Sequence, residues 1–392
     1  MFMRSFVAFV CLLISFVGLG QINPKYDVVD KKMAAIPVDF TTTTAKIATY
    51  INANFKTDED KLRAVFYWTA TNIDYDVKNM MIDNSEQPPA YKIANTLKTH
   101  KGVCIHYAEV FSAITTDLNL KNYIIEGFVK QGGKVSPLAH AWCAVQLDGN
   151  WYFVDPTFGA GGILNGKFSK RLNNAYYKVP PSKMALTHLP FDYLWQFLSS
   201  PVTFDFFISG KAGSAVAKIN FNFEQEIIRY QSLSFFDRFS ETVDRIESNG
   251  YKLPVITTYL EVMKKNKSAA RKNTGVEKMN MVAANYNQAI VLLNDLIFYR
   301  NKRFSPSISD EDLAIKGREP QEKLSQCLED VYRVGDVGEE NKAVLTALKS
   351  QINEAVRSSE EQNEFVQEYL KRSKIGRKLM FSKGAFFGVP MR

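Results

Sequence analysis

The feature that most constrains this fold is a hairpin signal between two apolar runs. Asp148-Gly149 is a dipeptide that strongly favours a two-residue turn between antiparallel strands. With such a turn, Trp142 lies opposite Asp155. His140, two residues before Trp142, is on the same face of the strand and within reach of the carboxylate. A three-residue turn would shift this parity unless a bulge restored it. We therefore predict two strands that bring an imidazole to a carboxylate.

Upstream of the hairpin, Cys104 opens a stretch with helical periodicity. From Val103 to Leu118, apolar side chains recur three and four residues apart, after a turn-like segment that ends at Gly102. Cys104 is therefore expected in the first turn of a helix, where unpaired N–H groups and the helix dipole favour an anion. The alternative is that Cys104 is a small buried hydrophobic residue.

These positions supply a nucleophile, a base and an orienting carboxylate in that order. Cysteine attacks carbonyl carbon as a thiolate, so it needs a neighbour that accepts its proton. A histidine in that role needs a third group to hold its tautomer and ring orientation. We assign the three roles to Cys104, His140 and Asp155.

Three sequence blocks occur in this order: Gly-Val-Cys at 102–104, His-Ala-Trp at 140–142, and Trp-Tyr-Phe-Val-Asp-Pro-Thr at 151–157. Together they resemble the transglutaminase-like superfamily, whose core is papain-like. The nearest branch is the kyphoscoliosis peptidase-like group, because its signatures resemble Ile-Asp-Tyr-Asp at 73–76, His-Leu-Pro at 188–190 and Trp-Gln-Phe-Leu at 195–198. The likeness covers roughly residues 57–207.

The resemblance implies an α+β fold with an antiparallel sheet. It also implies that Cys104 is the nucleophile, that His140 is the general base and acid, and that Asp155 orients His140. One departure concerns the second position after the nucleophile, where the family usually has glycine and this chain has His106. A larger, titratable side chain there would narrow the cleft, so His106 is a candidate substrate-binding residue; the alternative is a solvated or packed helix residue.

Two further positions are candidates for substrate binding. Trp142 lies two residues after the proposed base, and Gly161 belongs to a glycine-rich loop that follows the hairpin. The alternative for Gly161 is an ordinary connection between strands. The last histidine, His188, precedes Leu-Pro and is interpreted as a turn or packing residue.

A zinc site is the competing interpretation of the same region. Cys104 with His106 and His140 with Cys143 supply four ligand types that bind zinc. Residues two apart on a helix and three apart on a strand point away from each other, so neither pair converges. We predict no metal and no cofactor, and we place Cys143 in the core on the far face of its strand.

The N-terminus has the order of a secretory signal. A basic start at residues 1–4 precedes the apolar stretch 6–17, which is shorter than the roughly 20 residues of a membrane span. Small residues before Gln21 fit cleavage, so we predict a signal peptide at 1–20 and export to the periplasm or the exterior. The remaining cysteines form no disulfide framework, although a Cys143–Cys327 bridge stays open.

From about residue 221 the pattern changes to long amphipathic segments. The expected helices are 224–248, 254–272, 275–300, 310–334 and 339–372. We predict a transglutaminase-like domain at 21–212, an all-α bundle or short helical array at 213–372, and a basic tail at 373–392. The helical part would contact a protein partner or cover the cleft, or it is a structural appendage.

Composition and charge limit the classes of partner. Apolar residues make up 46% of the chain and charged residues 23%, which is typical of a globular protein. The net charge of +8 comes mainly from the C-terminal tail, whose basic residues are Lys371, Arg372, Lys374, Arg377, Lys378, Lys383 and Arg392. This tail is expected to contact an anionic surface, or it forms a basic helix end. Export argues against nucleic acid as a partner.

The first functional hypothesis is an exported cysteine hydrolase, a peptidase or amidase, that forms an acyl-thioester on Cys104 with peptide or protein substrates. Transfer of the acyl group to an amine, as a transglutaminase does, uses the same residues and stays open. The second hypothesis is a binding or assembly module with little turnover, in which the helical half carries the partner contacts.

Overall fold

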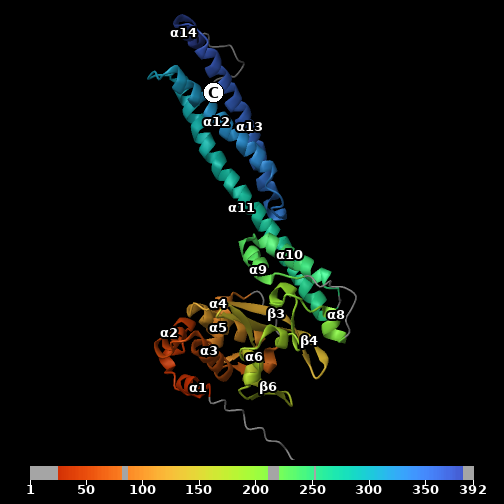
Figure 1. The fold of residues 1–392 in the computed structure, drawn as a ribbon. Helices are drawn as coiled ribbons and strands as arrows, with labels where there is room; N and C mark the ends of the chain where they lie inside the picture. The colour runs from red at the N-terminus through yellow and green to blue at the C-terminus, as the bar shows by residue number, and fades with distance from the viewer. Residues whose placement is uncertain (1–24, 82–86, 211–219, 251–252, 383–392) are drawn as a thin grey trace, which may run out of the picture. The chain divides into compact units, whose positions relative to one another are not determined.

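The computed structural model describes residues 25–81, 87–210, 220–250 and 253–382. Within them, the chain divides into two compact units (Figure 1). The first contains residues up to 232 together with 242–261, and the second contains 233–241 and the residues from 262 onward. The first unit thus extends beyond residue 212, the boundary predicted from the sequence. The predicted signal peptide at 1–20 and residues 383–392 of the basic tail lie outside the described residues.

Five helices open the first unit. They are α1 (Asp27–Ala34), α2 (Thr44–Asn54), α3 (Asp58–Asn72), α4 (Pro89–Thr99) and α5 (Cys104–Asp117). The Thr43 and Thr57 hydroxyls cap α2 and α3 by accepting from the backbone N–H groups of Lys46 and Asp60, at 3.2 and 3.1 Å. Such caps satisfy N–H groups that have no partner within the helix. The helix expected between Val103 and Leu118 is confirmed by α5.

A four-stranded antiparallel sheet has the order β5-β4-β3-β8. Its strands are β3 (Asn122–Gln131), β4 (Lys134–Leu147), β5 (Asn150–Val154) and β8 (His188–Pro190). Asp148 and Gly149 have φ angles of 49° and 78°, which a two-residue type I′ turn requires. Leu147 pairs with Asn150 and Cys143 with Val154, so this register, continued by one residue, would set Trp142 opposite Asp155. The predicted two-residue turn and its parity are confirmed.

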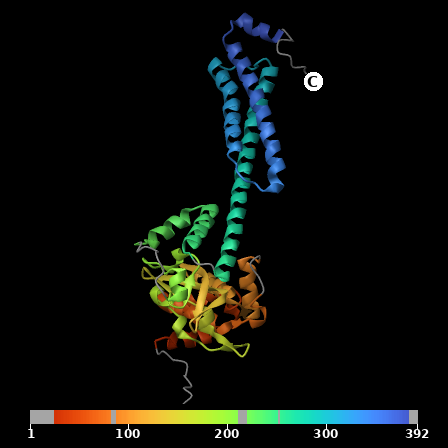
Figure 2. The same cartoon turned by 90° about the vertical axis from the view of Figure 1, so that its right-hand side faces the viewer.

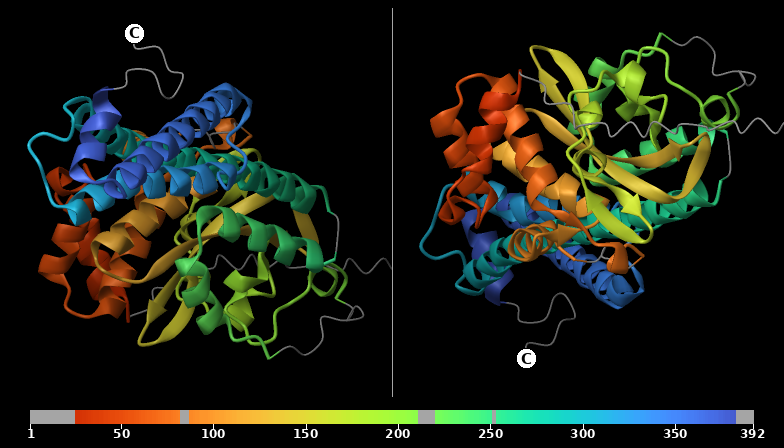
Figure 3. Two further views of the ribbon diagram at one scale, coloured as in Figure 1. Left: turned by 90° about the horizontal axis from the view of Figure 1, so that it is seen from above. Right: turned by 90° about the horizontal axis from the view of Figure 1, so that it is seen from below.

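Both faces of this sheet are buried. Alternate residues of β4, including Ala141, Cys143 and Val145, pack with α2, α3 and α5 in one hydrophobic core. Trp142 and Ala144 face a second core with aromatic residues of β5 and the following segments. Figure 3 shows the N-terminal helices, red to orange, on one side of the yellow strands. Cys143 is fully buried on the far face from Trp142, as predicted.

Shorter elements complete the first unit. They are β1 (Asp74–Tyr75), β2 (Lys101–Gly102), α6 (Pro156–Ala160), β6 (Gly161–Leu164), β7 (Lys167–Lys170), α7 (Pro181–Met184), α8 (Phe204–Ser209), α9 (Phe223–Ser232) and the 3-10 helices η1 (Val38–Phe40), η2 (Val77–Asn79), η3 (Asn174–Tyr176) and η4 (Tyr193–Gln196). β1 pairs in parallel with β2, directly before the helix that Cys104 begins.

A buried ion pair explains why the end of α10 (Phe235–Ser248) belongs to the first unit. Arg245 donates from Nε and Nη2 to the Asp192 carboxylate at 2.7 and 2.8 Å, and the Thr242 hydroxyl donates to the same carboxylate at 3.2 Å. All three side chains are buried. Because an unpaired buried charge is costly, this set of hydrogen bonds holds residues 242–248 on the segment that follows β8.

The second unit is helical and contains most of α11 (Pro254–Asn301), with α12 (Asp310–Tyr332), α13 (Glu339–Leu370) and α14 (Lys374–Ser382). Figure 2 shows α12 and α13 beside the C-terminal part of α11. Leu293, Leu324 and Ile352 contribute one side chain from each of these three helices to a shared core. The fold is therefore α+β followed by an α-helical part, which confirms the predicted class.

Two helix boundaries differ from those expected. The break predicted between 272 and 275 is absent, because α11 runs through Gly275. A Cβ atom at Gly275 would lie 1.9 Å from the Asp336 carbonyl oxygen, so this glycine permits a close backbone approach and does not end the helix. The single helix predicted at 224–248 is two, since the Ser234 hydroxyl accepts from the Asp237 N–H at 3.1 Å and starts α10 separately.

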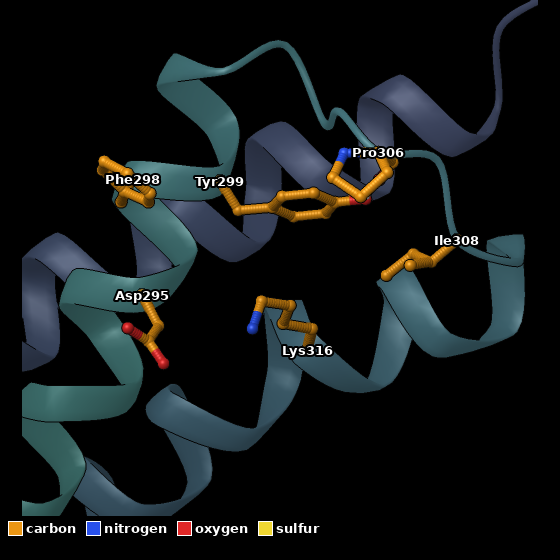
Figure 4. Close-up of a pocket in the computed structure, with 6 residues that line it drawn as sticks. All are labelled: Asp295, Phe298, Tyr299, Pro306, Ile308 and Lys316. Carbon is orange, nitrogen blue, oxygen red and sulfur yellow. The ribbon is translucent and has the colours of Figure 1, made fainter.

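The second unit also contains a mainly apolar pocket of about 310 Å³ (Figure 4). It is lined by Asp295, Phe298, Tyr299, Pro306, Ile308 and Lys316.

Among the helices that the structure describes, none combines the length and apolarity that crossing a membrane requires.

Candidate active site

Cys104 is the first residue of α5. The Asp76 N–H donates to the Gly102 carbonyl at 3.0 Å, so the β1–β2 pair fixes the backbone that leads into this helix. The first N–H groups of a helix lack partners within the helix and carry its positive end. Cys104 is half-buried, whereas Cys143 and Cys327 are buried, and all three thiols are free. Cys104 is thus the accessible cysteine of the described residues.

His140 lies on β4 with its ring packed between aromatic neighbours. The ring centroids of Phe158 and Trp142 lie 4.6 and 6.0 Å from that of His140. His140 Nε2 lies 2.7 Å from Asp155 Oδ2. Cys104 lies near enough to the same imidazole that its interaction with the ring raises the pKa of His140. The structure therefore brings together the three residues assigned from the sequence.

Asp155 follows β5 and its carboxylate accepts four hydrogen bonds. Oδ1 accepts from the backbone N–H groups of Thr157 and Phe158 at 2.9 and 3.0 Å, which makes Asp155 the N-cap of α6. Oδ2 accepts from His140 Nε2 at 2.7 Å and from His188 Nε2 at 3.1 Å. Asp155 is fully buried, and these donors compensate for the loss of water around its charge.

The electrostatics favour a charged pair. Burial alone would lower the pKa of His140, but the Asp155 carboxylate and its hydrogen bond, together with Cys104, raise it to about 10. Burial alone would raise the pKa of Asp155, but His140 and His188 hold it well below its usual range. Near neutral pH, this combination favours an imidazolium next to a carboxylate. The second imidazolium N–H is then available to the Cys104 sulfur.

His188 is the member of this site that sequence reasoning missed. The sequence predicts a turn or packing residue here, but His188 is fully buried on β8 and contacts the same oxygen of Asp155 as His140. Burial lowers the pKa of His188. No local spacing links it to Asp155. The available signal was the clustering of all four histidines between residues 100 and 188.

The Trp142 ring packs against both imidazoles of the site. Its ring centroid lies 6.0 Å from that of His140 and 5.2 Å from that of His188. The side chain is fully buried, and its indole N–H has no hydrogen-bond partner within the described residues. Its placement fits a wall of the site, and direct contact with substrate stays a prediction.

His106 caps the helix that Cys104 begins. Its Nδ1 accepts from the Val103 N–H at 3.0 Å, and a Cβ atom at Gly102 would lie 2.6 Å from the His106 Cβ. Burial, followed by the nearby Lys92, lowers the pKa of His106. His106 also lines a cavity of about 350 Å³ beside α4. His106, at the position where the sequence differs from the family pattern, thus caps the N-terminus of α5.

Gly161 ends α6 and begins the β6–β7 hairpin. Its φ of 145° and the position of the Ser169 carbonyl oxygen, 2.2 Å from where a Cβ atom would lie, require glycine. The backbone therefore accounts for this residue without a substrate contact.

Tyr75 is a further neighbour of the site. It lies on β1 opposite Gly102, two residues before the thiol. Burial, with the negative charges of Cys104 and Asp155, raises the pKa of Tyr75 to about 12. Its place in the Ile-Asp-Tyr-Asp segment was the sequence signal for it.

Metal ligation has one geometric candidate among the described residues. The ligand atoms of His140, Asp155 and His188 lie within 4.8 Å of one another. In the structure these groups satisfy each other by hydrogen bonds. Of the two pairs considered as zinc ligands from the sequence, His140 and Cys143 lie on opposite faces of β4, because Cys143 donates to the Ala108 carbonyl in the core. In the other pair, His106 Nδ1 already accepts from the Val103 N–H.

Comparisons with known proteins agree with this geometry. Residues 45–156 match the model of the transglutaminase-like superfamily, a range that contains Cys104, His140 and Asp155. The human and mouse proteins named kyphoscoliosis peptidase are each 29% identical over 153 and 152 residues, covering 37% of this chain and 23% and 22% of theirs. This chain therefore spans less than a quarter of the length of either relative.

Two further matches have lower sequence identity. The Lim and transglutaminase domain protein ltd-1 of Caenorhabditis elegans is 23% identical over 171 residues, covering 39% of this chain and 23% of that protein. A crystal structure of a TGase is 18% identical, with a TM-score of 0.23, over 42% of this chain and 38% of that chain. The comparisons thus show a similarity of residues 45–156 to the transglutaminase-like superfamily.

Proposed function

We propose that this protein is an exported cysteine hydrolase, a peptidase or amidase, that acts through Cys104, His140 and Asp155. One observation carries the proposal: a half-buried cysteine at the first position of α5 lies near enough to His140 to affect its pKa, and His140 Nε2 lies 2.7 Å from Asp155 Oδ2. A nucleophile, a base and an orienting group are arranged in this way in cysteine peptidases.

Acylation would begin from a pair in which His140 already carries the proton as an imidazolium and Cys104 is a thiolate. The thiolate attacks the carbonyl carbon of the substrate and forms a carbon–sulfur bond, while the carbonyl electron pair moves to oxygen. N–H groups in the first turn of α5 stabilise that oxyanion. When the tetrahedral intermediate collapses, the carbon–nitrogen bond breaks and His140 protonates the leaving amine.

Deacylation restores the starting pair. His140, neutral after it has protonated the amine, accepts a proton from water, whose oxygen attacks the thioester carbonyl. The carbon–sulfur bond then breaks, and Cys104 leaves as a thiolate beside the His140 imidazolium. An amine in place of water would give acyl transfer with the same residues. The acceptor that reaches the thioester decides between these outcomes, and hydrolysis is the reaction we propose.

Substrate class and location are parts of the same proposal. Peptide or protein substrates are supported by the relatives named kyphoscoliosis peptidase. Export to the periplasm or the exterior is supported by the basic and apolar order of the N-terminal sequence. A protein partner for the helical unit and an anionic surface for the basic tail remain secondary proposals.

Alkylation of the purified chain with iodoacetamide between pH 5 and 10 tests the assignment, with the modified cysteine mapped by mass spectrometry. We expect Cys104 to react well below pH ~8.5, the ordinary range for a free thiol, and to lose that behaviour in His140→Ala. Cys327→Ala is the matched control and should keep the wild-type profile. A Cys104 thiol that titrates ordinarily in both proteins would refute the proposal.

Hydrolysis is tested separately by incubating the protein with acyl-peptide substrates, with and without an added primary amine. Release of the free acid that requires Cys104 supports a hydrolase. Formation of the amide alone would identify an amine-accepting enzyme instead.

A further inference from the structure

His188 and Asp155 meet although they come from opposite edges of the sheet. β8 and β5 are separated by β3 and β4 in the strand order, yet His188 Nε2 lies 3.1 Å from Asp155 Oδ2. The sheet must curl to bring them together. Gly127 on β3 permits this, because a Cβ atom there would lie 2.6 Å from the Trp142 ring and 2.2 Å from the Leu189 carbonyl.

The hydrogen bonds and the burial of His188 together favour a neutral ring, because burial lowers its pKa. Nδ1 lies 2.9 Å from the Thr187 hydroxyl, which can donate to it, and Nε2 faces the Asp155 carboxylate, which can only accept. A neutral imidazole with its proton on Nε2 satisfies both contacts. The ring is packed against the rings of Trp142 and Phe158, with centroids 5.2 and 5.3 Å away.

We propose that His188 is a positioning residue that holds Asp155 in place for His140; this inference rests on the proposed function. Oδ1 of Asp155 is fixed by two backbone N–H groups of α6, and His188 supplies a permanent donor to Oδ2. His140 changes protonation state during the reaction, whereas His188 does not. The carboxylate therefore keeps its orientation when His140 gives up its proton.

The second donor also keeps the proton on the correct group. Each N–H that donates to Asp155 stabilises the carboxylate and disfavours transfer of the His140 proton to it. His188 therefore affects the reactivity of Cys104 indirectly, through Asp155 and His140. Its side chain needs no contact with the substrate.

Three variants of the full chain test this role by the pH profile of Cys104 alkylation. His188→Phe keeps an aromatic ring but removes the donor, and we expect the rate at pH 7 to fall about 10- to 100-fold, the usual range for a hydrogen bond to a charged group. His188→Gln retains an N–H donor and should recover most of the rate. Thr187→Val should cost less than His188→Phe, because Thr187 is exposed and water can replace its hydroxyl.

The steady-state readout separates positioning from general damage. With an acyl-peptide substrate, His188→Phe should lower kcat and leave KM near its wild-type value. Thermal unfolding shows whether the variants remain folded. A folded His188→Phe protein with the wild-type alkylation profile and kcat would overturn the proposal, while a wild-type Cys104 that never reacts as a thiolate would overturn the proposed function.

Nitrogen-15 spectra of the histidines provide a test that does not depend on activity. The chain has four histidines, so the His188 and His140 signals can be assigned from His188→Gln and His140→Gln. We expect His188 to stay neutral from pH 6 to 8 with its proton on Nε2, and His140 to carry protons on both nitrogens. A protonated His188 at pH 7, or one with its proton on Nδ1, would refute the role. Unprotonated Nε2 atoms on both rings, as cation binding requires, would also refute it.

Discussion

Gly127 lies directly opposite His140 in the register of β3 and β4. The base therefore faces a position without a side chain. On the other side of β3, Gly127 pairs with Pro190 of β8, close to His188. Gly127 thus lies on the strand between β4 and β8, which carry the two imidazoles of the site.

Replacement of Gly127 by Ala should destabilise the first unit. The new Cβ atom would lie 2.2 Å from the Leu189 carbonyl oxygen and 2.6 Å from the Trp142 ring, so β8 or the indole must move. We expect a loss of roughly 1–3 kcal/mol in the free energy of unfolding, measured with urea. Gly162→Ala is the control, because no atom lies within 4 Å of its added Cβ. Equal stability of the two variants would contradict the packing argument.

Replacement of Asp155 by Asn separates the two functions of this side chain. The amide oxygen can still accept from the Thr157 and Phe158 N–H groups, but the charge that raises the pKa of His140 is lost. We expect Cys104 alkylation at pH 7 to slow about 10- to 100-fold while the protein stays folded. Asp148→Asn makes the same chemical change in the hairpin turn and should react like the wild type. An unaffected Asp155→Asn protein would show that the carboxylate charge is dispensable.

Stability should decrease as the pH rises above neutrality. The pKa of His140 is raised to about 10 in the folded protein, against about 6.5 when unfolded. The resulting stabilisation is complete below pH ~6.5 and is lost as the pH approaches 10, because the folded state binds the extra proton. The free energy of unfolding of the wild type should therefore fall by a few kcal/mol more than that of His140→Gln over this range. Parallel pH dependences for the two proteins would disprove the link.

Replacement of Gly275 by Ala tests the continuity of α11. In an exposed helix, this change usually stabilises by up to about 1 kcal/mol. Here the Asp336 carbonyl oxygen would lie 1.9 Å from the new Cβ atom, so we expect a net loss of stability in thermal unfolding. Gly376→Ala in α14 is the control, since its nearest neighbour is the Arg372 side chain at 3.2 Å. A stabilised Gly275→Ala protein would mean that the loop accommodates the methyl group.

Local rules were sufficient for the hairpin and the nucleophile helix. The positive φ angles at Asp148 and Gly149 follow from the residues themselves, and the turn length then determines which residue faces Asp155. The helix at Cys104 follows from apolar spacing over four turns. For these elements the interactions that decide the structure are short-range, so the sequence pattern was informative.

The remaining features depend on tertiary packing. His188 reaches Asp155 through the curl of a sheet, 33 residues along the chain, which no periodicity encodes. The apolar spacing predicts separate helices at 254–272 and 275–300, with a break just before Gly275. The approach of Asp336 reverses that interpretation, and it is visible only once the helices are packed.

Asp155 caps a helix with one oxygen and holds two imidazoles with the other, and this double use restricts which amino acid the position can tolerate. Asparagine has the right length for the cap but offers the imidazoles an amide in place of a charge. Glutamate has the charge, but its extra methylene moves the oxygens away from the α6 N–H groups. Only aspartate meets both requirements, so a substitution at this position changes either the cap of α6 or the charge that holds the two imidazoles.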